Sequence, residues 1–313
     1  MALYHLAKPR GLETKSSLNP RSFVRSRAEA RPFLKWAGGK SQLLSELFAR
    51  VPRSFGRYFE PFLGGGALFF ALQSNGHTVE AYLSDANAKL IDTYRAVRDE
   101  VETVIAELTT FANDREAYYT VRAMRPDELG PALRAARFIY LNKTCYNGLY
   151  RENQRGEFNV PFGRYKNPRI CDAEKLRAAA LTLREVQLEC HDFGKMLDMA
   201  KAGDFVYLDP PYDPLSATSS FTSYHEDGFG EEEQRRLAAT VRELDRHGVY
   251  VVLSNSDTQL IRELYKGLIV DDVQAARAIN SKAERRGKIG ELIVRNYRDL
   301  AGTRAKTAGR GGC

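Results

Sequence analysis

The stretch GRYFEPFLGGGALFFALQSN, Gly56–Asn75, decides the fold because it predicts a buried strand, a Gly-rich turn and a helix in immediate succession. Glycine lets the backbone turn tightly and approach a ligand at a helix N-terminus. Gly64 and Gly66 match the start of a dinucleotide-binding fingerprint, but Phe69 stands where its third glycine is needed. The pattern therefore favours a nucleotide-like ligand without specifically favouring a pyrophosphate. A purely structural turn is the alternative.

Strands and helices alternate through most of the chain. Further strand-like runs are VEAYLSD (79–85), DFVYLDPPY (204–212), GVYVVLSNS (248–256) and GLIVDDVQA (267–275). Apolar residues at helical spacing predict one long helix over 86–112, and a second helix is predicted over 231–248. This alternation predicts an α/β fold with a mostly parallel sheet covered on both faces. Residues 268–278 and 289–297, joined by a short polar link, predict an antiparallel hairpin at the edge of the sheet.

Composition divides the chain into five segments. Residues 1–30 and 302–313 are basic and show no sustained periodicity, so we interpret them as flexible tails. The alternating pattern occupies 31–114 and 194–301, which we interpret as two parts of one core. Residues 115–193 interrupt this pattern with helical and then polar, turn-rich sequence. They are interpreted as an inserted, partly helical subdomain.

Positive charge is concentrated along the chain. The net charge is +7, and residues 134–170 hold eight Lys or Arg against two Glu. Residues 277–288 hold five Lys or Arg against one Glu. Basic charge gathered in an inserted subdomain indicates a surface that faces a polyanion, and ordinary solvated surface charge is the alternative.

The composition also excludes several classes of protein. With 43% apolar residues, a chain of 313 residues can bury a large core. No apolar run approaches the roughly 20 residues of a membrane span, and the N-terminus lacks the apolar stretch of a secretory signal. We therefore expect a cytoplasmic protein that does not enter a membrane. The spacing of Cys145, Cys171, Cys190 and Cys313 is not that of metal ligands, so we expect reduced thiols and no metal.

Two motifs are candidates for ligand binding beside the Gly-rich turn. Asp85 ends a predicted strand about 20 residues after the glycines, where a carboxylate can bind ribose hydroxyls. Capping of the next helix is its alternative role. In FLKWAGGK, Phe33–Lys40, a lysine at a helix start opposes the helix dipole. Lys40 is therefore a candidate to bind an anionic group such as a ligand carboxylate, with a solvated lysine beside a core Trp36 as the alternative.

The tetrapeptide DPPY, Asp209–Tyr212, carries the candidate chemistry. Asp209 follows an apolar strand, where open α/β sheets place their active sites. Pro210 and Pro211 fix the backbone, and the Pro210 carbonyl points in a rigid direction. Asp209 and this carbonyl can accept both hydrogens of an exocyclic amine while Tyr212 stacks on the base. The amine lone pair is then directed for attack. A simple polyproline turn is the alternative.

Together the motifs resemble the amino-methyltransferases of the DNA adenine methyltransferase family. The motifs FLKWAGGK, FEPFLGGGALF, NGLYRENQRGEFNVPFGRYK, DPPY and FTSYHEDGF recur in the family's order across residues 31–297. The order of cofactor motifs, inserted module and then DPPY matches the alpha arrangement of this class. The resemblance implies a Rossmann-like, seven-stranded S-adenosylmethionine-dependent fold. It also implies direct, metal-free methyl transfer from S-adenosylmethionine to the N6 amine of an adenine flipped out of duplex DNA.

The resemblance also implies residue roles. Cofactor binding is implied for Trp36, Lys40, Glu60, Gly64, Asp85 and Asp209, and the grip on adenine for Asp209, Pro210, Pro211 and Tyr212. Residues 115–193 become a target-recognition module whose RGEFN hairpin enters the DNA, with Arg155 reading a guanine edge. The resemblance further implies that Lys35 contacts a base and that Arg151, Arg164 and Lys166 contact phosphates. It also implies that Asn153 belongs to the hairpin that binds DNA.

We expect GATC as the recognition sequence, although Glu152 and Gln154 depart from the aromatic and aliphatic residues that often flank Asn153 in the family. A monomer suits a reaction on one strand, and a restriction endonuclease is a possible genetic partner.

The competing functions are cytosine-N4 methylation, RNA adenine methylation and catalytically inactive DNA binding. Asp209 favours adenine over cytosine, because cytosine-N4 relatives usually have Ser there.

Overall fold

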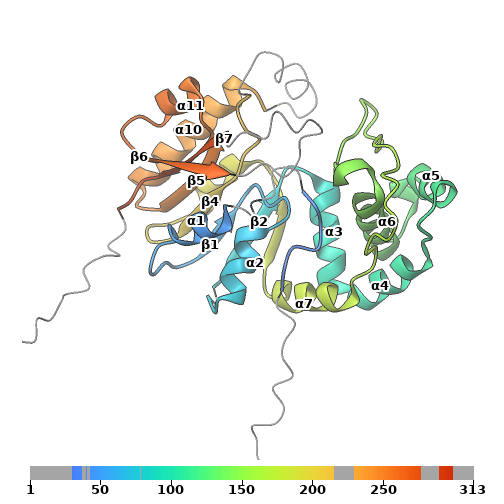
Figure 1. The fold of residues 1–313 in the computed structure, drawn as a ribbon. Coiled ribbons are helices and arrows are strands. Elements are labelled where there is room, and N and C mark those ends of the chain that lie inside the picture. The colour runs from blue at the N-terminus through green and yellow to red at the C-terminus, as the bar shows by residue number, and fades with distance from the viewer. Residues whose placement is uncertain are drawn as a thin grey trace, which may run out of the picture.

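A seven-stranded sheet forms the centre of the computed structural model, which describes residues 30–36, 40, 43–77, 79–214, 229–275 and 289–298. The strand order is β3-β2-β1-β4-β5-β7-β6 (Figure 1). The parallel strands are β1 Tyr58–Glu60, β2 Ala81–Asp85, β3 Gln187–Cys190, β4 Phe205–Leu208 and β5 Tyr250–Ser256. Antiparallel to β5 runs β7 Ile289–Arg295, which pairs with the edge strand β6 Ile269–Ala275. The predicted α/β fold and edge hairpin are confirmed.

Two hydrophobic clusters cover the two faces of the sheet, because side chains alternate along each strand. Tyr58 belongs to one cluster and its neighbour Phe59 to the other. The first face carries α1 Leu44–Phe48, α2 Ala67–Ser74, α3 Ala88–Asp99 and α7 Ala173–Leu183. The second carries α8 Met196–Met199, α10 Glu231–Arg246 and α11 Gln259–Leu264. Both faces are therefore buried, as expected for a parallel sheet.

The single helix predicted over 86–112 is wrong, because the structure has two helices there. α3 ends at Asp99 and α4 Val101–Thr110 begins after Glu100, whose φ of −133° and ψ of 36° are not helical. The break lets α4 turn and pack against α6 Pro131–Thr144, which also packs against α3. Helices α4, α5 Arg115–Ala123 and α6 form a lobe beside the sheet (Figure 1).

The range predicted for the inserted module, 115–193, includes parts of the sheet layer. β3 pairs with β2, and α7 packs against α3, so the end of this range belongs structurally to the core. Residues 145–172 between α6 and α7 hold the short 3-10 turn η3 Tyr146–Gly148 and a small hairpin bridged at Glu152 and Phe158. The other 3-10 turns are η2 Pro126–Glu128 and η4 Phe193–Lys195.

Several predicted segments lie outside the described residues: 1–29, the tail 302–313, the basic stretch 277–288 and all of FTSYHEDGF except Phe229. Among the helices in the described ranges, none is long and apolar enough to cross a bilayer.

Candidate active site

Three acidic residues lie at the carboxyl ends of adjacent parallel strands. Glu60 ends β1, Asp85 ends β2, and Asp209 directly follows β4. β1 pairs with both β2 and β4, so these strand ends share one edge of the sheet. The chain passes from β1 outward to β3 on one side and from β4 to β5 on the other. The point where the strand order reverses therefore lies between Glu60 and Asp209, where open α/β sheets bind ligands.

The Gly-rich turn lies against the indole of Trp36. Gly64 and Gly66 adopt positive φ angles of 46° and 65°, which favour glycine. A Cβ atom on Gly64 would lie 2.6 Å from Cδ1 of Trp36, so any side chain there would displace the indole. The Gly64 amide donates a 3.1 Å hydrogen bond to Oδ2 of Asp85. Gly64 thus brings the indole of Trp36 and the carboxylate of Asp85 to one turn, as a shared ligand site requires.

Asn87 caps α3, which removes the capping role considered for Asp85. The Asn87 side chain accepts a hydrogen bond from the Leu90 amide at 3.1 Å. Asp85 accepts instead from the amides of Gly64 and Asn87. Burial raises the pKa of Asp85, and these two hydrogen bonds oppose the rise.

Glu60 is a buried carboxyl with a strongly perturbed pKa. Burial raises its pKa to about 8, and the nearby Asp209 adds to the rise. The Tyr58 hydroxyl, which donates to Oε2 at 2.9 Å, and the Phe69 amide oppose it. Glu60 is therefore mostly protonated at neutral pH, and a cation placed beside it would favour ionisation.

Lys40 forms a buried ion pair with Asp209 and is not the solvated lysine of the alternative interpretation. Its Nζ lies 2.8 Å from Oδ1 of Asp209 and 4.4 Å from the ring centroid of Tyr212. The Ser254 hydroxyl donates to the same carboxylate oxygen at 2.8 Å. Burial raises the pKa of Asp209, and both Lys40 and Ser254 counteract it. DPPY is therefore part of an electrostatic network and not a simple polyproline turn.

A buried polar network fixes the backbone of DPPY, and sequence reasoning missed it. The Gln234 amide donates to the Pro211 carbonyl at 2.8 Å, and Asn255 donates to Gln234 Oε1 at 3.0 Å. Asn255 also accepts from the Asp213 amide at 3.1 Å. The Tyr212 hydroxyl donates to Glu291 on β7 at 2.9 Å. The polar run Ser254–Ser256 after an apolar strand was a usable signal, whereas Gln234 inside a charged helix gave none.

The predicted DNA-facing side chains lie apart from this buried site. Arg151, Asn153, Arg155, Arg164 and Lys166 are all exposed. Asn153 shapes the hairpin turn, because its Oδ1 accepts from the amides of Arg155 and Glu157, both at 3.0 Å. Arg151 Nε donates to the Asn159 side chain at 2.7 Å.

Lys35 joins the core to the module. Its backbone exchanges two hydrogen bonds with the Asn142 side chain, and its exposed ammonium lies 4.7 Å from the Tyr165 ring centroid. Beside it, η3 and the residue that follows it expose two large apolar side chains, Tyr146 at 52% and Leu149 at 40%. Sequence reasoning missed both, although exposed apolar side chains within a basic segment are a recognisable sign of binding.

The fold and site define a Rossmann-like enzyme with a ligand site at the reversal of strand order and a separate basic hairpin. The sequence matches the model of the family described as D12 class N6 adenine-specific DNA methyltransferase over residues 36–283, and the chain belongs to that family. It is therefore an adenine-specific DNA methyltransferase. In the parts of the chain that the structure describes, no group of three or more His, Cys, Asp or Glu side chains is placed to hold a metal ion.

Three relatives illustrate the similarity. A type II methyltransferase of Lactococcus lactis subsp. cremoris is 43% identical, covering 87% of this chain and 98% of its own length. A type II methyltransferase of Methanocaldococcus jannaschii is 42% identical, covering 86% and 100%. The DNA adenine methylase of Escherichia coli is 39% identical, covering 84% and 94%. Each match spans nearly the whole relative.

The raised pKa of Glu60 predicts a pH-dependent contribution to stability. In the unfolded chain this carboxyl ionises near 4.5, but in the folded protein it ionises near 8. The stability of the wild type relative to Glu60→Gln should therefore fall from about pH 4.5 to about pH 8, by up to about 1.4 kcal/mol per pH unit, and then level off. Denaturant unfolding of both proteins at several pH values measures this. A constant difference would contradict the assigned burial.

Replacing Gln234 by Leu should disturb DPPY while leaving the volume of the buried side chain nearly unchanged. The Pro211 carbonyl and the Asn255 amide each lose a partner, which should cost about 1–3 kcal/mol of stability. Misplacement of DPPY should lower the single-turnover rate of methyl transfer about tenfold or more. Thr240→Val, on the same helix, is the control, because the Thr240 hydroxyl donates to the Arg236 carbonyl within that helix. An unchanged rate in Gln234→Leu would refute the positioning role.

Proposed function

We propose that this enzyme takes its methyl group from S-adenosylmethionine and transfers it to an adenine flipped out of duplex DNA at a short sequence. The observation that carries the proposal is the position of DPPY. Asp209, the Pro210 carbonyl and the Tyr212 ring lie at the reversal of strand order, beside the Gly-rich turn and two further carboxylates. A methyl donor and an amine acceptor can therefore meet at one edge of the sheet.

The residues around the Gly-rich turn fit S-adenosylmethionine. This molecule carries a sulfonium, an ammonium and ribose hydroxyls, and the edge offers the carboxylates of Glu60, Asp85 and Asp209 for them. Gly64 leaves room for close approach of the backbone, because it lacks a Cβ next to Trp36. Neutral Glu60 would ionise beside a bound cation, which offsets part of the cost of burying that cation. When bound, S-adenosylmethionine would supply the electrophilic methyl group.

DPPY would hold the adenine amine for a direct in-line attack on that methyl carbon. The carbon–sulfur bond would break as the carbon–nitrogen bond forms, S-adenosylhomocysteine would leave, and the extra amine proton would be released to solvent. Lys40 and Ser254 both bind Oδ1 of Asp209, so we assign Oδ2 as acceptor for one amine hydrogen and the Pro210 carbonyl for the other. Tyr212, fixed by Glu291, would stack on the base. A carboxylate next to the nitrogen stabilises the positive charge that develops there during transfer. No covalent intermediate with the protein is required.

The exposed hairpin and its surroundings would read the DNA. Arg155 lies exposed at the hairpin turn, where a guanidinium can bond the edge of a guanine. Tyr146 and Leu149 have the character of side chains that wedge between bases, which would help to hold a flipped adenine out of the stack. Arg151, Arg164 and Lys166 would contact phosphates. GATC is the proposed recognition sequence.

The test of this function is to incubate the full chain with S-adenosylmethionine and unmethylated plasmid, and to map modified bases by single-molecule sequencing. We expect N6-methyladenine at one short motif. Methylcytosine would overturn the base assignment, and methylation of RNA alone would overturn the substrate. Cofactor binding without any methylation would indicate an inactive DNA-binding protein.

Asp209→Ala should abolish methyl transfer, with a loss of at least about 100-fold in single-turnover rate, because the amine loses its charged acceptor. The substitution also breaks the buried ion pair with Lys40, which should cost about 3–5 kcal/mol of stability, so folding of the variant is checked by circular dichroism. Asp99→Ala, which removes an exposed aspartate paired with Arg98 at the end of α3, is the control for loss of an ion pair away from the site. Wild-type activity in Asp209→Ala would reject its assigned role.

Arg155→Ala should relax discrimination at one guanine of the motif by about 1–3 kcal/mol. Lys166→Ala should instead weaken binding to all duplexes alike and reduce the salt slope by about one. Competition binding with duplexes substituted at each position distinguishes the two effects. Unaltered sequence preference in Arg155→Ala would assign guanine reading to another residue.

A further inference from the structure

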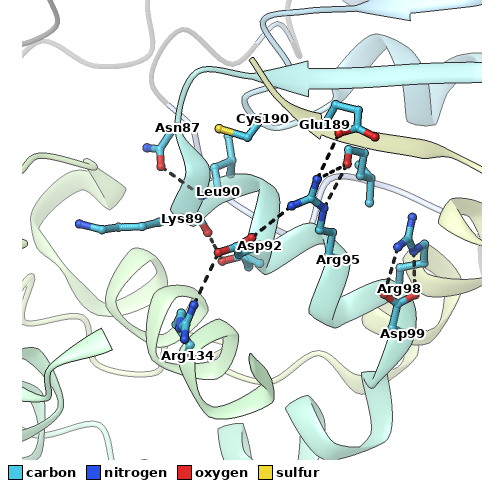
Figure 2. A network of polar contacts seen from close by, with 12 residues as sticks. Asn87, Lys89, Leu90, Asp92, Arg95, Arg98, Asp99, Arg134, Glu189 and Cys190 are labelled. Atoms are coloured by element: carbon cyan, nitrogen blue, oxygen red, sulfur yellow. Dashed lines mark hydrogen bonds and ion pairs between the residues drawn. The ribbon is translucent and has the colours of Figure 1, made fainter. Parts of the chain in front are cut away.

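Helix α3 is held in place along its length by charged side chains. Arg95 bonds the Leu188 carbonyl and lies 3.5 Å from Glu189, both on β3. Asp92 lies 3.6 Å from Arg134 on α6. Figure 2 shows these contacts together with Asn87 and Lys89 at the first turn of the helix. The middle of α3 is thus tied to both the sheet and the helical lobe, and Lys89 lies one turn before it.

Lys89 extends from this first turn to the hairpin of residues 150–159, here called the reading hairpin. Its Nζ lies 2.7 Å from Oε1 of Glu152 and donates to the Gly156 carbonyl at 2.6 Å. A lysine in the first turn opposes the helix dipole, so α3 itself gains no stability from it. The favourable contacts of the ammonium are with the hairpin, on both sides of its turn.

The base of the reading hairpin contacts the residues proposed to bind S-adenosylmethionine, Trp36, Gly64 and Asp85, here called the cofactor edge. The Tyr150 hydroxyl donates to Glu152, and the Tyr150 ring stacks on Trp36 with centroids 5.6 Å apart. Trp36 contacts Gly64, which bonds Asp85, and Asp85 accepts from the Asn87 amide two residues before Lys89. These contacts close a ring that begins and ends at α3. The ring includes both the hairpin and the groups proposed to bind S-adenosylmethionine.

We infer that Lys89 is a positioning residue that couples the reading hairpin to the cofactor edge, so that duplex DNA and S-adenosylmethionine each tighten binding of the other. A ligand that orders the Gly64–Trp36–Asp85 contacts also orders the base of the hairpin, and DNA on the hairpin orders the same contacts from the other side. The two affinities must then change by one common factor. The inference rests on the proposed function. Glu152, which departs from the residue type that the family often has beside Asn153, is the hairpin side chain that Lys89 binds.

The test is the affinity of the full chain for S-adenosylhomocysteine, by calorimetry, alone and saturated with a duplex carrying the motif that sequencing identifies. The wild type should bind about 5- to 150-fold more tightly with DNA, the usual range of such coupling. In Lys89→Met this ratio should fall to about 1–2, while the affinity without DNA stays within about twofold. Glu152→Gln should lower the ratio from the hairpin side.

Two further variants separate positioning from general stability. Lys89→Arg retains donors for both Glu152 and Gly156 and should retain the wild-type ratio. Arg177→Met removes another ion pair between elements, to Glu102, that is remote from the hairpin and should leave the ratio unchanged. A merely structural role of Lys89 would lower thermal stability and leave the ratio as in the wild type.

The outcomes for the inference and for the proposed function are distinct. An active wild type with no coupling, or with equal coupling in Lys89→Met, overturns the inference alone. A wild type that binds neither S-adenosylhomocysteine nor S-adenosylmethionine overturns the proposed function first.

Discussion

Burial of three carboxyl groups at neighbouring strand ends is the constraint on which the rest of the site depends. Glu60, Asp85 and Asp209 are brought together because β1 pairs with both β2 and β4. Burial raises the pKa of each. Different partners oppose the rise in pKa at each position. Tyr58 donates to Glu60, two backbone amides donate to Asp85, and Lys40 and Ser254 bind Asp209. A cation beside these groups would favour their ionised forms and offset part of this cost of burial, so the site favours a cationic ligand.

Much of this arrangement could be predicted from sequence because its signals are local. The run from Gly56 to Asn75 specifies strand, turn and helix, and parallel strands necessarily bring their carboxyl ends to one edge. The break at Glu100 could not be predicted, since α4 turns away to pack on α6, a contact between distant residues. Gln234 and Lys89 were missed for the same reason. Each is an ordinary polar residue of an exposed-looking helix, and its partners are far away in the chain.

The position of the reading hairpin suits the two tasks that the proposed function gives to the protein. In that proposal, exposed Arg155 needs freedom to meet DNA, whereas the flipped adenine has to reach Asp209 with little positional error. The tip of the hairpin is exposed, whereas its base is fixed against Trp36 and α3, so both requirements are met. Packing of Tyr150 against Trp36 and Phe158 costs little side-chain freedom, because aromatic rings have few rotamers.

Lys40 connects the two ligands of the proposed function. It binds Oδ1 of Asp209 and lies over the Tyr212 ring, and these are the groups that the proposed function assigns to the adenine. In that proposal Lys40 and Ser254 stay on Oδ1 and leave Oδ2 for the amine, but the positive charge of Lys40 weakens the negative charge that Oδ2 presents. A carboxylate of the proposed methyl donor beside Lys40 would offset part of that positive charge. The donor would then strengthen the hold on the base as well as supply the methyl group.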